Sequence, residues 1–308
     1  MAETASWLGG ILIPVGAFVA AGFLLRRRLG VGMGALGRVG LYVFSPALVF
    51  QSIVTSRLSG HDLWGIGAFA AAMAATGVGI SRAAGRLFRL PPAEQAAWDL
   101  ATTFSNTANL GLPVVAFALG TQSLHAAVLF VLTQVVLVNT VGAYLAGQSG
   151  LDPRSAWGRI VRLPALWALL AAVAWRLVGW PLPVGLARAL SAGSEAYSPT
   201  VLLVLGGALA DWRAGEDRRL DRPAAWGLTL LRLTVMPLAA VAWVKLLGLS
   251  GPTERALILE LAMPVAVNAL ILAQEFEAAP LVVGQAVALS TLAAAVTVPA
   301  WLWLLVRG

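Results

Sequence analysis

The sequence predicts an all-α integral membrane protein with ten transmembrane helices arranged as two inverted five-helix repeats. The 308-residue chain is 59% hydrophobic and only 11% charged, with a mean hydropathy of +0.83, whereas a soluble domain carries about 25% charged residues. Ten apolar runs are each of about the length that crosses a bilayer. Two proline-centred motifs of the first half recur in the second half at almost the same spacing.

Short polar or turn-rich segments separate the ten runs. The runs are 7–25, 36–56, 63–81, 94–119, 123–146, 160–179, 185–209, 226–247, 254–276 and 280–305. Ten spans of about 20 residues use about 200 residues, which leaves no room for a separate soluble domain. We therefore expect one membrane domain, with a first repeat at 1–150 and a second at 151–308.

Arginine clusters between the runs predict the orientation, because cytoplasmic loops carry an excess of Lys and Arg. An external N-terminus places fifteen of the 21 Lys and Arg residues on the cytoplasmic side and six outside. The sequence thus predicts a multi-pass protein of the cell inner membrane with both termini outside. In this scheme Arg232 snorkels toward the cytoplasm from the eighth run, and Asp99 is solvated near the cytoplasmic end of the fourth.

Composition and motifs argue against several other classes of protein. Cysteine is absent, and no G-x-S-x-G or H-E-x-x-H motif occurs, so we expect no enzyme, no metal site and no cofactor. The segment GMGALG (32–37) has dinucleotide-binding spacing but follows a membrane span rather than a strand, which favours a turn with close helix packing. The net charge of +7 lies in short clusters without interleaved aromatics, so no nucleic-acid partner is expected.

Two motifs relate the halves of the chain. Ser45-Pro46 recurs 153 residues later as Ser198-Pro199, and Pro113 of NLGLPV recurs 151 residues later as Pro264 of ELAMPV. Because each half contains five spans, an odd number, the halves enter the membrane from opposite sides. Such inverted repeats are typical of secondary transporters, whose substrate site lies near the bilayer midplane.

The fourth run contains a polar cluster, SNTANLGLPV (105–114). Pro113 lacks an N–H and clashes with the carbonyl four residues earlier, so it predicts a helix break, and Gly111 lets the backbone leave the helical region. Asn106 and Asn109 add amide donors and acceptors. Freed backbone groups are tolerated only inside protein or beside a wet cavity, so the cluster favours a binding site over a kink whose asparagines merely hold neighbouring helices.

The ninth run contains the counterpart, ELAMPVAVNALILAQEF (260–276). Pro264 predicts a second break, and Asn268 lies one turn beyond it. Glu260 is a carboxylate in apolar surroundings, and intramembrane acids are costly and usually functional. Glu260 could bind a proton or a sodium ion, or it could brace the break through hydrogen bonds.

Five motifs along nearly the whole chain resemble the auxin efflux carrier family, which includes bacterial permeases and plant auxin carriers. They are SPALVFQSI (45–53), NTANLGLPV (106–114), SPTVLLVLGGAL (198–209), LELAMPVAVNALILAQEF (259–276) and STLAAAVTVP (290–299). The link between the fifth and sixth runs is short, as in the bacterial members. Asn106, Pro113, Pro264 and Asn268 match family positions, whereas the second proline that plant carriers place at Ala269 is missing.

The resemblance implies that the fourth and ninth helices unwind and cross near the midplane, as in bile-acid symporters and NhaA. One bundle would be a scaffold, and the other would carry the crossed helices and move as an elevator. Family members move small organic anions, such as mono- or dicarboxylates or an auxin-like carboxylate. The chain is accordingly expected to be a secondary transporter that works by alternating access in the lipid bilayer, with a possible homodimer as its assembly.

The predicted substrate-binding residues are Asn106, Asn109, Gly111, Pro113, Pro264 and Asn268, with Glu260 as the residue for ion or proton coupling. No arginine is expected at the midplane, so helix dipoles and amides would meet the charge of the substrate. Two alternatives stay open. One is a sodium-coupled bile-acid-type symporter, for which Glu260, Gln274 and Asn268 are the candidate sodium ligands, and the other is a channel or a substrate-sensing membrane protein.

Overall fold

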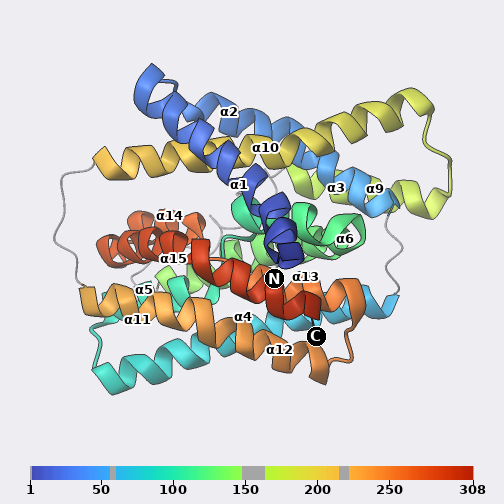
Figure 1. Cartoon of the computed structure of the whole chain (residues 1–308). Coiled ribbons are helices and arrows are strands. Elements are labelled where there is room, and N and C mark those ends of the chain that lie inside the picture. The colour runs from blue at the N-terminus through green and yellow to red at the C-terminus, as the bar shows by residue number, and fades with distance from the viewer. Residues whose placement is uncertain (1, 56–59, 148–163, 215–221, 308) are drawn as a thin grey trace. The chain divides into compact units, whose positions relative to one another are not determined.

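The computed structural model describes residues 2–55, 60–147, 164–214 and 222–307, and helices form nearly all of them (Figure 1). The elements in the first half are α1 (Ala2–Leu29), α2 (Met33–Val39), η1 (Gly40–Phe44), α3 (Ser45–Thr55), α4 (Gly60–Phe88), α5 (Pro92–Thr103), η2 (Thr107–Gly111), α6 (Leu112–Leu137), η3 (Val138–Gly142) and α7 (Ala143–Ala146). Those in the second half are α9 (Pro164–Val178), α10 (Val184–Ala214), α11 (Arg222–Leu230), η5 (Leu231–Val235), α12 (Met236–Leu246), α13 (Gly251–Leu261), α14 (Val267–Glu275) and α15 (Pro280–Arg307). The η elements are single π-helical turns.

Five described segments are long and apolar enough to cross a membrane, which confirms an all-helical protein with several candidate spans. They are Met33–Thr55, Gly60–Phe88, Thr107–Ala146, Ala225–Leu246 and Pro280–Val306. The third of these is interrupted at Gly120, whose φ of 74° and ψ of −174° are not helical. The sequence placed the boundary between its fourth and fifth runs at this point. Much of the predicted links at 147–159 and 210–225 lies outside the described residues.

The chain divides into two compact units that do not coincide with the predicted repeats. Unit 1 comprises residues 1–58, 108–128 and 162–217, and unit 2 comprises residues 59–107, 129–161 and 218–308. Each unit therefore takes segments from both halves of the sequence. The segment GMGALG, which has dinucleotide-binding spacing, lies in unit 1 and leads into α2 without a preceding strand.

In unit 1, helices α1 and α10 bring their backbones into direct contact. A Cβ atom added to Gly22 would lie 2.0 Å from the carbonyl oxygen of Leu203, and one added to Gly206 would lie 2.0 Å from that of Val19. Glycine at such positions allows two apolar helices to approach more closely than any larger residue would permit. The α1–α10 contact thus depends on one glycine from each helix.

Replacing Gly206 by Ala is expected to destabilise the protein, because the new methyl group meets the α1 backbone and the two helices must separate. Forced overpacking of this kind typically costs about 1–3 kcal/mol, and thermal unfolding in detergent would measure the loss. Gly16→Ala is the matched control in α1, since a Cβ there meets no atom within 4 Å. Equal stability of the two variants would contradict the close contact.

Three π-helical turns share one sequence signature: a proline stands two residues after the last residue of the turn. Pro46 follows η1, Pro113 follows η2 and Pro237 follows η5 in this way. Proline has no N–H for the carbonyl one turn earlier, and its ring pushes that carbonyl away. The helix widens by one residue there instead of ending.

The prediction that Pro113 breaks the fourth helix is therefore wrong. Pro113 is the second residue of α6, and the η2 turn before it absorbs the missing hydrogen bond. The hydroxyl of Tyr197 on α10 donates to the carbonyl oxygen of Ala108, five residues before the proline, at 3.3 Å. The helix can continue because this freed carbonyl has a partner inside unit 1.

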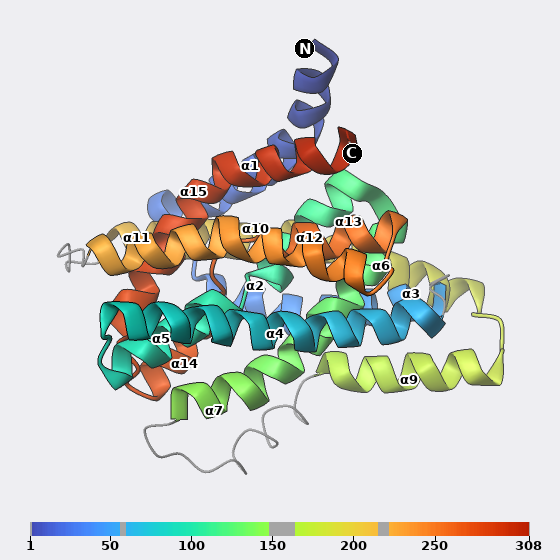
Figure 2. The ribbon, with the colours of Figure 1, turned by 90° about the horizontal axis from the view of Figure 1, so that it is seen from below.

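In unit 2, helices α5, α14 and α15 gather at one end, as Figures 1 and 2 both show. The core there is made of small and branched side chains together with Trp98, Phe104 and Phe276. Two neighbouring segments press closely on the end of α5. A Cβ at Gly142 would lie 3.0 Å from the ring of Phe104, and one at Gly77 would lie 2.9 Å from Cα of Thr103. This packing fixes the point at which α5 ends.

Candidate crossover site

The chain crosses itself in unit 2, where two helices end and non-helical segments follow. Helix α5 is followed by residues 104–106, and helix α13 by residues 262–266. Ser105 and Val265 form an antiparallel bridge. The N–H of Asn106 donates to the carbonyl of Pro264 at 2.8 Å, and the N–H of Ala266 donates to that of Phe104 at 3.0 Å. The two breaks therefore satisfy one another's backbone groups, in the crossing that the resemblance implies.

Side chains from neighbouring helices satisfy more of the unwound backbone. The amide nitrogen of Gln134 donates to the carbonyl of Ser105 at 2.6 Å, and the Ser105 hydroxyl donates to Oε1 of Gln134 at 3.4 Å. The N–H of Val265 donates to the hydroxyl of Ser290 at 3.0 Å. Buried backbone groups need such partners, so these contacts hold the crossover, which we define as residues 104–106 and 262–266.

The sequence suggested that Arg232 snorkels to a membrane surface. In the structure it instead lies at the crossover with 0% of its surface exposed. Its Nε donates to the carbonyl oxygen of Met263 at 3.1 Å, and its two terminal nitrogens donate to those of Thr102, at 2.9 Å, and Leu261. No carboxylate lies within 4 Å of Arg232 among the described residues. An arginine therefore lies against the two broken helices, which was not expected from the sequence.

The electrostatic reason for this placement lies in the helix ends. The carbonyls at the C-terminus of a helix carry a partial negative charge and lack intrahelical partners. Helices α5 and α13 both end at the crossover, and one guanidinium caps them both. The prediction failed because Arg232 was assigned by its nearness to the start of an apolar run. Its position six residues after the start of the apolar run and five before Pro237 was the available signal for a functional charge.

Several buried polar atoms near the crossover have no hydrogen-bond partner among the described residues. They are Oγ1 of Thr102, Oγ1 of Thr103, Nδ2 of Asn106 and both carboxylate oxygens of Glu260. Glu260 is 0% exposed and Asn106 is 3% exposed. Leaving such groups unpaired costs free energy, so their concentration on the last residues of α5, the break and the end of α13 indicates a place for a ligand or an ion.

A small cavity with room for about one water molecule adjoins the same region of unit 2. Thr103 and Gln134 are its polar lining residues. The rest of the lining is apolar, namely Ala70, Met73, Ala74, Phe104, Phe130, Leu137 and Leu261. That space is too small for an organic ligand, since ligand sites usually measure about 300–1,000 Å³.

The predicted site residues fall into two groups. Asn106 and Pro264 meet at the crossover, and Glu260 lies on the last turn of α13, all in unit 2. Asn268 is also in unit 2, as the second residue of α14, with an exposed side chain. The other three, Asn109, Gly111 and Pro113, belong to unit 1. Their role in a substrate site stays a prediction.

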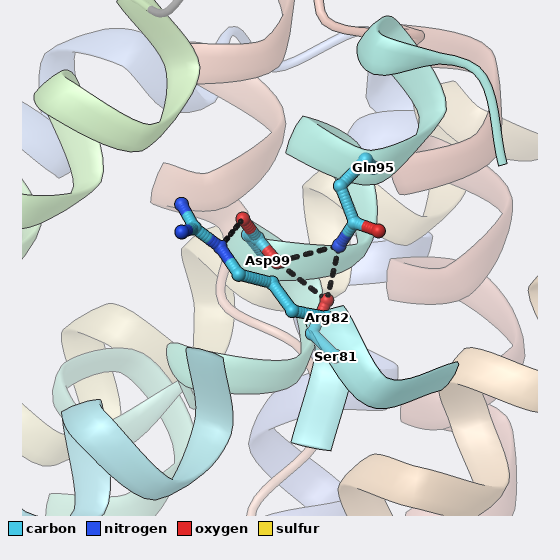
Figure 3. A network of polar contacts seen from close by, with 4 residues as sticks. All are labelled: Ser81, Arg82, Gln95 and Asp99. Atoms are coloured by element: carbon cyan, nitrogen blue, oxygen red, sulfur yellow. Dashed lines mark hydrogen bonds and ion pairs between the residues drawn. The ribbon is translucent and has the colours of Figure 1, made fainter. Parts of the chain in front are cut away.

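The sequence suggested that Asp99 is solvated, but the structure buries this residue on α5. Its side chain is the centre of a polar network that joins α4 to α5 (Figure 3). Oδ1 accepts hydrogen bonds from the Ser81 hydroxyl at 2.6 Å and the Gln95 amide at 2.8 Å, and Oδ2 accepts one from Nε of Arg82 at 3.4 Å. The network holds α5, the helix that leads into the crossover, against α4.

Replacing Asp99 by Ala is expected to destabilise the protein by about 2 kcal/mol, because hydrogen bonds to a charged group contribute about 1.5–3 kcal/mol and the Ser81 hydroxyl and Gln95 amide lose their shared acceptor. Thermal unfolding in detergent would measure the change. Arg82→Ala is the control and should cost less, since the Arg82 side chain is 43% exposed and exposed ion pairs contribute little. The reverse order would contradict the central position of Asp99.

Two comparisons with known proteins bear on this geometry. A family model described as "Membrane transport protein" matches the chain twice, over residues 3–152 and 153–302. The chain belongs to the auxin efflux carrier family of membrane transport proteins. The double match indicates an internal repeat in this carrier. The inversion of the two repeats is still a prediction.

A relative of known sequence covers nearly the whole carrier. It is described as an uncharacterized transporter of Methanothermobacter thermautotrophicus and is 29% identical over 296 residues, which are 94% of this chain and 96% of that protein. Both comparisons confirm the resemblance to transporters and the assignment of the chain as a transporter rather than an enzyme. Neither names a substrate.

Proposed function

We propose that this carrier is a secondary transporter that moves a small organic anion across the inner membrane by alternating access. The observation that carries the proposal is the crossover, in which two non-helical segments meet through Ser105 and Val265. Unwound backbone at the meeting of two broken helices is the form of substrate site found in inverted-repeat transporters. In unit 2 of this carrier the site would centre on Asn106, Pro264 and Asn268, and Asn109, Gly111 and Pro113 stay predicted substrate residues.

The charges around the crossover favour an anion as the substrate. Arg232 places a full positive charge against the ends of α5 and α13, and helix α14 begins at Val267, directly after the second break. Helix N-termini carry partial positive charge and attract anions. The Nδ2 group of Asn106, which has no partner among the described residues, would donate a neutral hydrogen bond to a substrate oxygen.

Glu260 is proposed as the coupling residue and would carry a proton. Both of its carboxylate oxygens are buried without a partner in the described part of the chain. A carboxylate in such a place is strongly destabilised as a lone charge, so a proton can neutralise it during the cycle. The sequence also left open that Glu260 braces the break through hydrogen bonds. Among the described residues, neither of its carboxylate oxygens has a hydrogen-bond partner.

Transport in liposomes tests the proposal. A thermal-shift screen of the purified carrier against mono- and dicarboxylates identifies ligands, because a ligand that binds the folded state raises its apparent stability. The best ligand is then radiolabelled and its uptake is measured with and without unlabelled ligand inside the vesicles. Saturable uptake that internal ligand accelerates is the result expected of a carrier. Single-channel currents would instead show a channel, and the proposal would be wrong.

A further inference from the structure

The crossover contains a cluster of three carbonyl oxygens, from Thr102, Leu261 and Met263, which we call the carbonyl cluster. Two of them terminate α5 and α13, and the third lies in the second break. In transporters built on broken helices, C-terminal helix ends and unwound carbonyls of this kind coordinate a sodium ion or take part in proton coupling. The geometry therefore presents a cation site.

A side chain of the carrier itself already fills this cluster. Three nitrogens of Arg232 each donate to a different one of the three carbonyls. The guanidinium is fully buried, and every partner that the structure gives it is a backbone oxygen. A buried arginine normally pairs with a carboxylate, so an arginine satisfied only by backbone carbonyls is placed where a free cation would otherwise lie.

We propose that Arg232 is a resident cation that takes the place of a coupling sodium ion, so that the carrier requires no sodium. Only the statement that transport requires no sodium rests on the proposed transport function. The occupancy of the carbonyl cluster itself is a property of the folded protein. The arrangement also gives the two residues separate roles, because Arg232 holds the ends of α5 and α13 while Glu260 is left free to exchange a proton.

The test compares thermal unfolding of the purified carrier, without substrate, in sodium chloride and in choline chloride at equal ionic strength. Choline is too large to enter a cluster of three carbonyls, so a difference between the two salts reports a sodium site. The wild type should show no difference. A rise in its unfolding temperature that is specific to sodium would overturn the proposal.

Removing the side chain should create a vacant cation site. Arg232→Ala is expected to unfold at a lower temperature than the wild type and to recover part of the loss with low-millimolar guanidinium chloride or with sodium chloride, but not with choline chloride. Guanidinium at this concentration is far below denaturing levels and replaces the missing group. A folded Arg232→Ala protein that is indifferent to guanidinium and sodium would overturn the proposal.

Two further substitutions separate charge from hydrogen bonding. Arg232→Lys keeps the positive charge, so it should remain more stable than Arg232→Gln and insensitive to sodium, whereas Arg232→Gln keeps donors without charge and should gain the response to cations. Equal behaviour of the Lys and Gln variants would show a hydrogen-bonding brace and not a resident cation. These comparisons also decide the matter if Arg232→Ala fails to fold.

Arg176 provides the matched control, since it is an exposed arginine that donates to a single backbone carbonyl, that of Ile53, at 3.0 Å. Arg176→Ala should show no response to guanidinium or sodium. All of these unfolding measurements are made without substrate. A carrier that fails to transport any anion would therefore overturn the proposed function without affecting the result for Arg232.

Discussion

Replacing Asn106 by Ala is expected to reduce anion uptake into liposomes by at least tenfold while the protein stays folded. The backbone of Asn106 holds the crossover through the carbonyl of Pro264, and alanine keeps that N–H. Only the side-chain amide is removed, and its Nδ2 group is buried without a partner among the described residues. A site that hydrogen-bonds its substrate discriminates strongly when such a group is lost.

The Asn106→Ala experiment needs a measure of folding beside the uptake assay, because a collapsed crossover would also abolish transport. Its unfolding temperature should stay near that of the wild type, while the temperature rise caused by the screened ligand disappears. Ser191→Ala is a suitable control, since the Ser191 hydroxyl donates to Glu195 on the same helix, in an exposed position. If a folded Asn106→Ala protein takes up the anion at the wild-type rate, the assignment of the substrate site is wrong.

Replacing Glu260 by Gln is expected to leave the protein folded and to remove the dependence of transport on pH. Glutamine has nearly the same shape, but it cannot take up or release a proton in this range. Uptake of one anion measured between pH 5 and pH 8, with and without a pH gradient across the vesicle, would show the effect. The wild type should respond to the gradient, and the variant should respond only to the anion gradient and the membrane potential.

An exposed carboxylate gives the matched control for Glu260. Glu195 on α10 accepts a hydrogen bond from the Ser191 hydroxyl at 3.0 Å in an exposed position, so Glu195→Gln should leave the pH dependence unchanged. If the pH dependence survives in Glu260→Gln, then Glu260 is a structural residue. The coupling proton must in that case be sought elsewhere in the carrier.

The crossing of two interrupted helices was predictable because the family motifs lie at both interruptions and Pro264 marks the second one. Pro264 lies within the second break, as expected. The first break, however, lies seven or more residues before Pro113, because the η2 turn lets the chain pass this proline as a helix. A proline removes one hydrogen-bond donor, and the tertiary environment decides whether a π-helical turn or a break compensates for it.

The ionisable residues were the least predictable part of the site. Arg232 and Asp99 were both assigned to polar surroundings, since hydropathy ranks a residue by its neighbours in sequence and not by its partners in space. Their true partners are the carbonyls of α5 and α13 for Arg232, and a serine and a glutamine on α4 and α5 for Asp99. Contacts 130 residues apart in the chain, such as Arg232 with Thr102, leave no local pattern.

The crossover also sets an order on the biosynthesis of this carrier. Ser105 and Val265 are bridged across about half of the chain's length, and the carbonyl of Thr102 accepts a hydrogen bond from Arg232. When the ribosome has completed only the first half, the carbonyl of Phe104 and the N–H of Asn106 have no partners, and apolar lipid cannot supply any. The first half of the chain must therefore wait, near water or the insertion machinery, until α13 and the segment that follows it are made.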